Sequence, residues 1–367
     1  MSKKKAKRIT VKIGTRVLTD KNNRIDRDVI KNLSRQMASL MDKGIEVVLV
    51  SSGAIGAGLG LLDLKKKGRS LSELQAIASV GQNHLMDIYN EHLGKKGYVA
   101  GQILLTREDF NDRKRFLNIR YTLNTLLKYR AIPIINENDS ISTDEIKFGD
   151  NDRISSLVAD LASSDMLVIL TDVEGLYDQK GKLIRHVDLV TGKIKALCRG
   201  KGCEESAGGM ISKLDSVRNA AQAGIEGVIA RGREKDVLLR VADGEDVGTR
   251  FDAHEKPLRA RKRWIAFGRK PRGKVMVDEG AEKALIERNK SLLPSGVVAV
   301  KGNFADGDVV EVVGKTDRVI ARGLSNYTSE EMKKIMGKKS QSIEEELGYK
   351  DYDEVIHRDN LVIFEES

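Results

Sequence analysis

Amide and carboxylate side chains cluster in two short stretches of this chain. Residues 136–139 (Asn-Glu-Asn-Asp) come directly after an apolar run, and residues 149–152 (Gly-Asp-Asn-Asp) precede a helix-like segment. Burying such groups unpaired is costly, so we expect them at the solvent-accessible end of a strand, where they address a polar, partly cationic ligand. This pattern favours a site for an amino acid.

Two lysines accompany glycine-containing turns. Lys12 lies in a strand-like segment and precedes Gly14, so a backbone turn would bring its ammonium close to a phosphate. A lysine on the solvated side of a strand is the ordinary alternative. Lys213 follows a second glycine-containing loop and is expected in the first turn of a helix, where the helix dipole disfavours a cation unless an anion is nearby.

Two further turns are candidates for ligand contacts. Residues 51–58 (Ser-Ser-Gly-Ala-Ile-Gly-Ala-Gly) follow a strand and open a helix, so their amides and hydroxyls would face an anion at a positive helix end. The stretch is neither a Walker loop nor a dinucleotide fingerprint, and tight packing is an alternative reason for its glycines. Thr171 and Asp172 close another strand, a position where open α/β sheets bind ligands, although an ordinary turn is the alternative.

Together these pieces suit transfer of a phosphoryl group to a carboxylate. Two lysines would offset the negative charge that builds up where a carboxylate approaches ATP. A carboxylate is already ionised at neutral pH, so the reaction needs no general base. The histidines of this chain show no ligand spacing, which is consistent with that chemistry.

The elements that must position these residues indicate an α/β fold. From about residue 8 to residue 252, short β-branched runs alternate with helical patterns, as in a mainly parallel sheet covered on both faces. The expected strands are residues 9–13, 46–50, 99–105, 132–136, 166–171 and 227–230. The expected helices are residues 28–43, 71–93, 113–129, 154–162 and 212–223, from their apolar spacing.

The composition changes after Phe251. Residues 254–263 are charged and poor in apolar side chains, and short strands with glycine turns follow from Gly273, with one more strand conceivable near residue 361. The expected division is a first domain over residues 1–255, a linker over 256–272, a small β-rich domain over 273–351 and a C-terminal tail over 352–367.

Length and charge set the outer bounds. A chain of 367 residues with 40% hydrophobic content favours two domains and at least one large core. A net charge of +10 suits an anionic partner such as a nucleotide or a nucleic acid, but basic residues scattered over a solvated surface are the commoner explanation. RNA binding is disfavoured because the β-rich part lacks an aromatic stacking platform.

Cysteine usage and hydropathy indicate the compartment. Two cysteines in a polar stretch argue against a disulfide framework and a structural zinc site. The basic N-terminus lacks the apolar segment of a signal peptide, and no apolar run is long enough to span a bilayer. We therefore expect a cytoplasmic protein that does not act at a membrane.

A series of motifs in order resembles the amino acid kinase family over nearly the whole chain. The motifs are residues 12–15, 51–55, 101–106, 136–139, 149–152, 208–210 with Lys213, and 261–264. The C-terminal part resembles the PUA domain that many of these kinases carry. Arg16 departs from the family pattern, which often has a small hydroxyl residue there, and Ser206-Ala207 replaces a more usual Gly-Thr.

The resemblance implies a fold, a reaction and a set of site residues. The fold is a three-layer α/β/α sandwich with a largely parallel sheet of about eight strands, plus a small β-rich PUA domain. The reaction is ATP-dependent phosphorylation of the side-chain carboxylate of L-glutamate, the first step of proline biosynthesis. By position, Lys12 and Lys213 would be catalytic with Asp152 orienting them, and the glutamate-binding residues would be Ser52, Asp139, Asp150 and Asn151. ATP would be held by Lys12, Thr171, Asp172, Ala207, Gly208, Gly209, Met210, Ile211, Ser212 and Lys213.

Ligands and partners follow from the same resemblance. Magnesium is expected to arrive with ATP and to need no dedicated protein site, because it prefers phosphates and water. Proline is the expected feedback inhibitor, and a homo-oligomer, either dimer or tetramer, is the expected assembly. The next pathway enzyme, glutamate-5-phosphate reductase, is a candidate partner.

Overall fold

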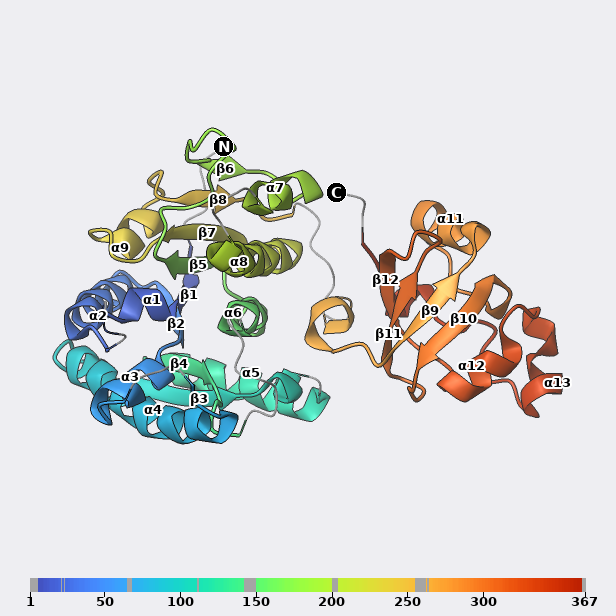
Figure 1. The fold of residues 1–367 in the computed structure, drawn as a ribbon, viewed down its shortest axis with the longest axis horizontal. Helices are drawn as coiled ribbons and strands as arrows, with labels where there is room; N and C mark the ends of the chain where they lie inside the picture. The colour runs from blue at the N-terminus through green and yellow to red at the C-terminus, as the bar shows by residue number, and fades with distance from the viewer. Residues whose placement is uncertain are drawn as a thin grey trace. The chain divides into compact units, whose positions relative to one another are not determined.

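The chain divides into two compact units, each built around its own sheet. In the computed structural model the units are Met1–Pro257 and Leu258–Ser367 (Figure 1). The structure describes residues 6–20, 22, 24–64, 68–110, 112–141, 150–199, 204–254, 262 and 264–364. No helix among these residues combines the length and the apolar character needed to cross a bilayer.

An eight-stranded sheet forms the centre of the first unit, in the order β3-β4-β2-β1-β5-β7-β8-β6. Its strands are β1 (Arg8–Ile13), β2 (Glu46–Ser51), β3 (Ala100–Leu105), β4 (Ile132–Glu137), β5 (Met166–Thr171), β6 (His186–Val187), β7 (Glu226–Arg231) and β8 (Thr249–Phe251). The run from β3 to β7 is parallel, whereas β8 pairs antiparallel with β7. The largely parallel sheet expected from the sequence is confirmed. The short strands β6 and β8 were not predicted, because two or three residues carry no periodic signal.

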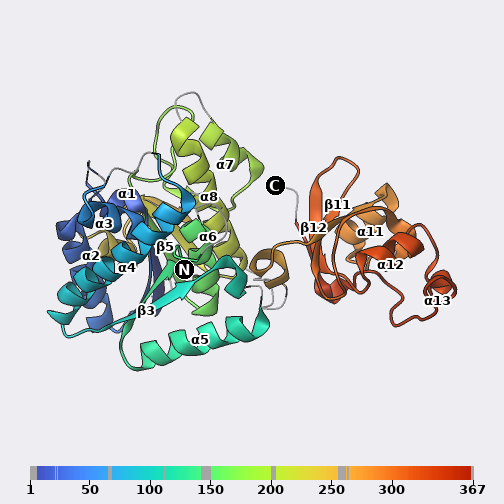
Figure 2. The ribbon, with the colours of Figure 1, turned by 60° about the horizontal axis from the view of Figure 1, so that its bottom comes forward.

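Helices cover both faces of this sheet, which gives the expected three layers. They are α1 (Thr15–Leu18), α2 (Arg27–Asp42), α3 (Ala54–Leu61), α4 (Leu71–Gly94), α5 (Arg113–Lys128), α6 (Asp150–Leu161), α7 (Gly192–Ala196), α8 (Glu204–Gln222) and α9 (Val237–Ala242), with short 3-10 turns at Arg107–Phe110 and Leu197–Arg199. Helices α2 and α9 pack on one face and α6 and α8 on the other (Figure 1). Figure 2 shows α6 beside α8.

Side-chain caps fix where two of the long helices begin. Asp26 accepts a hydrogen bond from the backbone amide of Val29 at the start of α2. Ser70 and Glu73 form a reciprocal capping box at the start of α4. Such caps satisfy backbone amides that have no partner inside the helix, so these boundaries are set locally by the sequence.

Helix α8 begins earlier than its sequence suggests, which corrects one expectation. The stretch around Gly208 and Gly209 was predicted to be a loop, with Lys213 in the first turn of the following helix. The structure places both glycines inside α8, which starts at Glu204. A glycine costs a helix only about 1 kcal/mol, so neighbouring contacts override it. Lys213 therefore does not lie at a helix N-terminus.

The second unit is a five-stranded sheet in the order β10-β9-β11-β12-β13. Its strands are β9 (Gly273–Val277), β10 (Val297–Gly302), β11 (Val309–Val313), β12 (Val319–Leu324) and β13 (Leu361–Ile363). Its helices are α11 (Glu279–Arg288), α12 (Ser329–Ile335) and α13 (Ile343–Leu347), with 3-10 turns at Pro294–Gly296, Ser340–Ser342 and Arg358–Asn360.

Part of the range expected as a linker is folded into the second unit. Trp264–Gly268 forms a short π-helix. Within it, Ile265 and Ala266 are buried against Val309 and Val362. The apolar residues at 264–266 thus form a small apolar cluster with the sheet of the second unit.

Helices α3 and α4 approach each other so closely that glycine is required at the crossing. A Cβ atom on Gly81 of α4 would lie 1.8 Å from the carbonyl oxygen of Ala54, and one on Gly58 of α3 would lie 2.0 Å from that of Ile77. Because the opposing atoms are backbone, no side-chain rotation relieves such a clash. The contact fixes α3, which directly follows the Ser52-Gly53 turn.

Replacing Gly81 by alanine should therefore destabilise the first unit. We expect Gly81→Ala to lower the free energy of unfolding by about 3 kcal/mol or more, at or beyond the upper end of overpacking costs. Gly94→Ala, in the last turn of the same helix, meets nothing within 4 Å and should change it by less than about 1 kcal/mol. Urea unfolding of both variants provides the measurement. Equal midpoints would contradict the close approach.

Candidate active site

The candidate site lies where the parallel strands β1, β2, β4 and β5 end. Strand β1 is central, with Ile13 in register with Ser51 of β2 and Leu170 of β5. The chain leaves β1 for β2 on one side and later returns to β5 on the other. Ligands of open α/β sheets bind at such a switch point, beyond the carboxyl ends of the strands.

One buried carboxylate holds two lysine ammonium groups at this point. The Lys12 Nζ atom lies 2.5 Å from Oδ1 of Asp152, and the Lys213 Nζ atom lies 3.6 Å from Oδ2 of the same residue. Asp152 is 1% exposed and Lys12 is 5% exposed. Lys12 comes from β1, Asp152 from α6 and Lys213 from α8. Lys12 and Lys213 are 201 positions apart in the sequence.

The environment of Lys213 disfavours its charged form. Burial lowers the pKa of Lys213 below its ordinary value of 10.5, and the nearby charge of Lys12 acts in the same direction. The carboxylates of Asp152 and Asp172 oppose this shift. The Lys213 ammonium also donates a 3.0 Å hydrogen bond to the carbonyl oxygen of Gly209, one helical turn earlier. Two cations facing a single carboxylate leave an excess of positive charge, which an anion would offset.

The burial of this site corrects another expectation. Polar residues of the two clusters were predicted to be solvent-accessible, but Asn136 and Asp152 are each only 1% exposed. Their position at strand ends is as predicted. Burial is tolerated because each has partners, the lysines for Asp152 and other amides for Asn136. The alternative considered for Lys12, a position on the solvated side of its strand, is not found either. Lys12 is buried and paired with Asp152.

A second group of polar side chains joins Ser52 to the site. The Nδ2 group of Asn151 donates to Oγ of Ser52 at 3.1 Å and to Oδ1 of Asn136 at 3.0 Å. Asn136 in turn donates to Oε1 of Gln82 at 2.7 Å. The remaining Oδ1 atom of Asn151 is buried and has no hydrogen-bond partner among the described residues. Such an unpaired acceptor costs about 1–3 kcal/mol, unless a ligand supplies the donor.

The end of β5 carries the expected Thr171-Asp172 pair. Thr171 donates from Oγ1 to Oδ1 of Asp172 at 3.0 Å. Arg16 donates to Oδ2 of the same carboxylate at 3.2 Å. The arginine that departs from the family pattern thus reaches from α1 to the residue after β5, and adds a third cation to this edge of the sheet.

The structure places the other expected site residues as follows. Asp139 is half-buried in a turn after β4, and Asp150 is the first residue of α6. Gly209, Met210, Ile211 and Ser212 lie in α8, partly exposed. Ala207 and Gly208 belong to the backbone of the same helix. The side chains of Asp150 and Ala207 lie outside the described residues, as does Gly149.

Sequence reasoning missed Gln82, and it placed Asn136 in the amide-rich cluster at the site without identifying its partner. Gln82 lies on α4 and is 8% exposed, on the face that also buries Leu85 and Tyr89. A glutamine within such an apolar stripe was the available signal, since a buried amide requires a partner. The partner lies on another element, so the sequence did not identify it.

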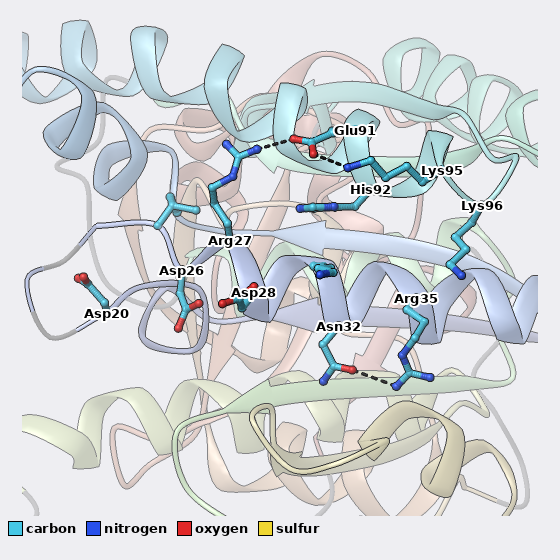
Figure 3. A pocket seen from close by; sticks show the side chains of 12 residues that line it. Asp20, Asp26, Arg27, Asp28, Asn32, Arg35, Glu91, His92, Lys95 and Lys96 are labelled. Atoms are coloured by element: carbon cyan, nitrogen blue, oxygen red, sulfur yellow. Dashed lines mark hydrogen bonds and ion pairs between the residues drawn. The ribbon is translucent and has the colours of Figure 1, made fainter.

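Another hollow in the first unit is lined by charged side chains that are more exposed. It measures about 1060 Å³ and lies between α2 and α4, with acidic and basic side chains along its walls (Figure 3). Arg27 and Lys95 both pair with Glu91, and Arg35 pairs with Asp236. Arg27, Lys95 and Glu91 are each at least 40% exposed, so water screens their charges, whereas Asp152 and its two lysines are largely buried.

Among the described residues, one group has potential metal ligands within reach of each other, namely His186, Asp188 and Asp252. All are exposed, at the outer strand β6 and just after β8. The Nδ1 atom of His186 is 3.0 Å from Asp188, and its Nε2 atom is 2.9 Å from Asp252. Both ring nitrogens therefore face carboxylates, and the group does not resemble a preformed catalytic metal site.

Comparison with known proteins agrees with this architecture. The profile of the amino acid kinase family matches residues 7–231, and that of the PUA domain matches residues 273–347. The chain belongs to the amino acid kinase family.

Three relatives of similar length share one name, glutamate 5-kinase. The glutamate 5-kinase of Thermoanaerobacter sp. (strain X514) is 47% identical over 364 residues, which covers 98% of each chain. That of Caldanaerobacter subterraneus subsp. tengcongensis is 48% identical with the same coverage. A third, from Trichlorobacter lovleyi, is 45% identical over 367 residues and also covers 98% of each chain.

The charge arrangement at Asp152 predicts how Lys213 titrates. Because Asp152 favours the charged lysine, Asp152→Asn should lower the Lys213 pKa further below 10.5. Asp215→Asn removes a carboxylate that pairs with Lys195 and should leave that pKa nearly unchanged. The measurement is an NMR titration of ¹³C-labelled lysine side chains. A Lys213 pKa that rises in Asp152→Asn would show that the carboxylate does not act on it.

Proposed function

We propose that this chain transfers the γ-phosphoryl group of ATP to the side-chain carboxylate of L-glutamate, giving L-glutamyl 5-phosphate and ADP. The observation that carries the proposal is the pair of buried ammonium groups on one carboxylate, at the carboxyl ends of parallel strands. Membership of the amino acid kinase family and relatives named glutamate 5-kinase support the same reaction. It opens proline biosynthesis, and we expect it in the cytoplasm.

The proposed step needs positioning and charge more than acid–base chemistry. A carboxylate oxygen of glutamate forms a bond to the γ-phosphorus while the bond from that phosphorus to the β,γ-bridging oxygen breaks, and ADP leaves with the electron pair. No proton has to be removed from the acceptor. Lys12 and Lys213 would lie beside the transferring group and stabilise its negative charge. Asp152 would hold both ammonium groups in place.

The remaining site residues divide between the two substrates. Thr171, Asp172 and the first turns of α8 from Ala207 to Lys213 would hold the nucleotide. Ser52, Asp139, Asp150 and Asn151 would hold glutamate, with the carboxylates facing its ammonium group. Magnesium would bind mainly through ATP phosphates and water, because the oxygens of Asp152 and Asp172 already face Lys12, Lys213, Thr171 and Arg16.

Regulation and assembly are proposed on the family resemblance. Proline shares its amino-acid head group with glutamate and would inhibit through the same pocket. A dimer or tetramer is the proposed assembly. The acyl phosphate product is labile, which favours direct transfer to glutamate-5-phosphate reductase.

The direct test is phosphate transfer from ATP to glutamate by the purified protein. We expect formation of ADP that depends on glutamate, with trapping of the product by hydroxylamine as a hydroxamate. N-acetylglutamate and aspartate serve as alternative acceptors. Turnover of either of these without turnover of glutamate would overturn the proposed substrate.

Substitutions should separate the roles of the charged residues. Lys12→Ala and Lys213→Ala are each expected to lower kcat by about 100-fold or more, because they remove charge that stabilises the transition state. Asp139→Ala should mainly raise the KM for glutamate. Lys195→Ala, which removes a lysine paired with Asp215 on α8, is the matched control and should stay within about twofold of the parent. If the lysine substitutions raised only the KM for glutamate and left kcat unchanged, the lysines would have the substrate-binding role and not the role of stabilising the transition state.

A further inference from the structure

Three carboxamide side chains from different elements, two of them buried and the third half-buried, form a chain that ends at the candidate glutamate site. Gln82 of α4 is 8% exposed and Asn136 at the end of β4 is 1% exposed. Asn136 donates to Gln82 at 2.7 Å and accepts from Asn151 of α6 at 3.0 Å. The direction in which each amide points decides which end donates a hydrogen bond and which end accepts one.

A backbone group fixes that direction. The amide N–H of Glu137 can only donate, and it donates to Oδ1 of Asn136 at 2.9 Å. The oxygen of Asn136 is therefore on that side, and its NH2 group must face Gln82. Gln82 must then present its oxygen, since two NH2 groups cannot pair with each other. The orientation of Gln82 and Asn136 thus follows from one unambiguous donor.

The same reasoning fixes the orientation of Asn151. Its Nδ2 group faces Oδ1 of Asn136, Oγ of Ser52 and, at 3.4 Å, the carbonyl oxygen of Ser51. A flipped amide would set its oxygen against two of these oxygens, which can only accept. The Oδ1 atom of Asn151 is consequently directed away from them, buried and without a partner among the described residues.

The location of Asn151 ties this acceptor to the reaction centre. Asn151 directly precedes Asp152, which binds both lysines, and it contacts Ser51 and Ser52 at the end of β2. Ser51 is in register with Ile13, the residue after Lys12. A ligand whose carboxylate lies at the lysines would therefore have its other polar groups within reach of Asn151.

We propose that Gln82 is a positioning residue that, together with the backbone amide of Glu137, holds Asn136 and thereby keeps the Oδ1 atom of Asn151 turned toward the acceptor. This orientation selects an acceptor that carries a hydrogen-bond donor, namely the protonated α-amino group of an amino acid, over a dicarboxylic acid without one. The inference rests on the proposed function, because it assumes that the acceptor is an amino acid with a second carboxylate.

The test compares variants that keep or remove the acceptor at position 82. Gln82→Met has a similar shape but offers only a weak sulfur acceptor, so the NH2 group of Asn136 loses its partner and Asn136, which orients Asn151, is held by the Glu137 amide alone. We expect its glutamate KM to rise about tenfold, with the KM for ATP within about twofold of the parent. Gln82→Glu retains an acceptor oxygen and should restore the glutamate KM to within about threefold. Tyr98→Phe, which removes a hydroxyl of another buried residue that bonds to Asp42 and not to the site, is the matched control and should also stay within about threefold.

Glutarate, which lacks the amino group, separates positioning from a general structural effect. The parent protein should prefer glutamate over glutarate in kcat/KM, and Gln82→Met should reduce that preference about tenfold by weakening glutamate alone. Equal losses for both acceptors, or an unchanged glutamate KM, would overturn the proposal. If Gln82→Met does not fold, Gln82→Asn, one methylene too short to reach Asn136, replaces it with the same expected results.

A failure of the proposed function gives a different outcome. If the parent protein does not phosphorylate glutamate, the orientation is still measured by the side-chain amide NMR signals of Asn151. These should shift in Gln82→Met and be preserved in Gln82→Glu. Signals that do not change in Gln82→Met would overturn the positioning role whatever the acceptor is.

Discussion

The site depends on one interaction, the sharing of the Asp152 carboxylate by Lys12 and Lys213. Burial makes every charge in this cluster expensive unless it is paired. One carboxylate cannot neutralise two ammonium groups, so the cluster keeps a positive excess in a place of low exposure. A phosphate that arrives there meets cations already held in position. The rest of the first unit can be understood as the scaffold that maintains this arrangement.

Helix α6 connects the charged and the neutral parts of the site. Its adjacent residues Asn151 and Asp152 have different partners, an amide chain for the first and two lysines for the second. A rotation of α6 about its axis would disturb both sets of contacts together. Its packing against β1 and α8 therefore matters to the geometry of the site as much as the identity of either residue.

All described residues of the candidate site belong to the first unit. The second unit has its own core, with residues such as Val275, Val312 and Met332 fully buried. The sequence predicted a PUA domain in this part of the chain and a β-rich unit, and both predictions are confirmed. The helices α11, α12 and α13 among its described residues were not predicted, because short helices in a strand-rich segment give weak periodicity.

The sequence by itself determined the main strands, the long helices and the identities of the charged residues. These follow from local properties: β-branched runs, apolar spacing, capping residues and motifs of the amino acid kinase family. Only the tertiary structure decided that Asp152 lies buried between Lys12 and Lys213, that α8 starts before its glycines, and that Gln82 belongs to the amide chain. The physical reason is that burial and pairing depend on strand order and helix packing, which join residues far apart in the chain and leave no mark in local sequence.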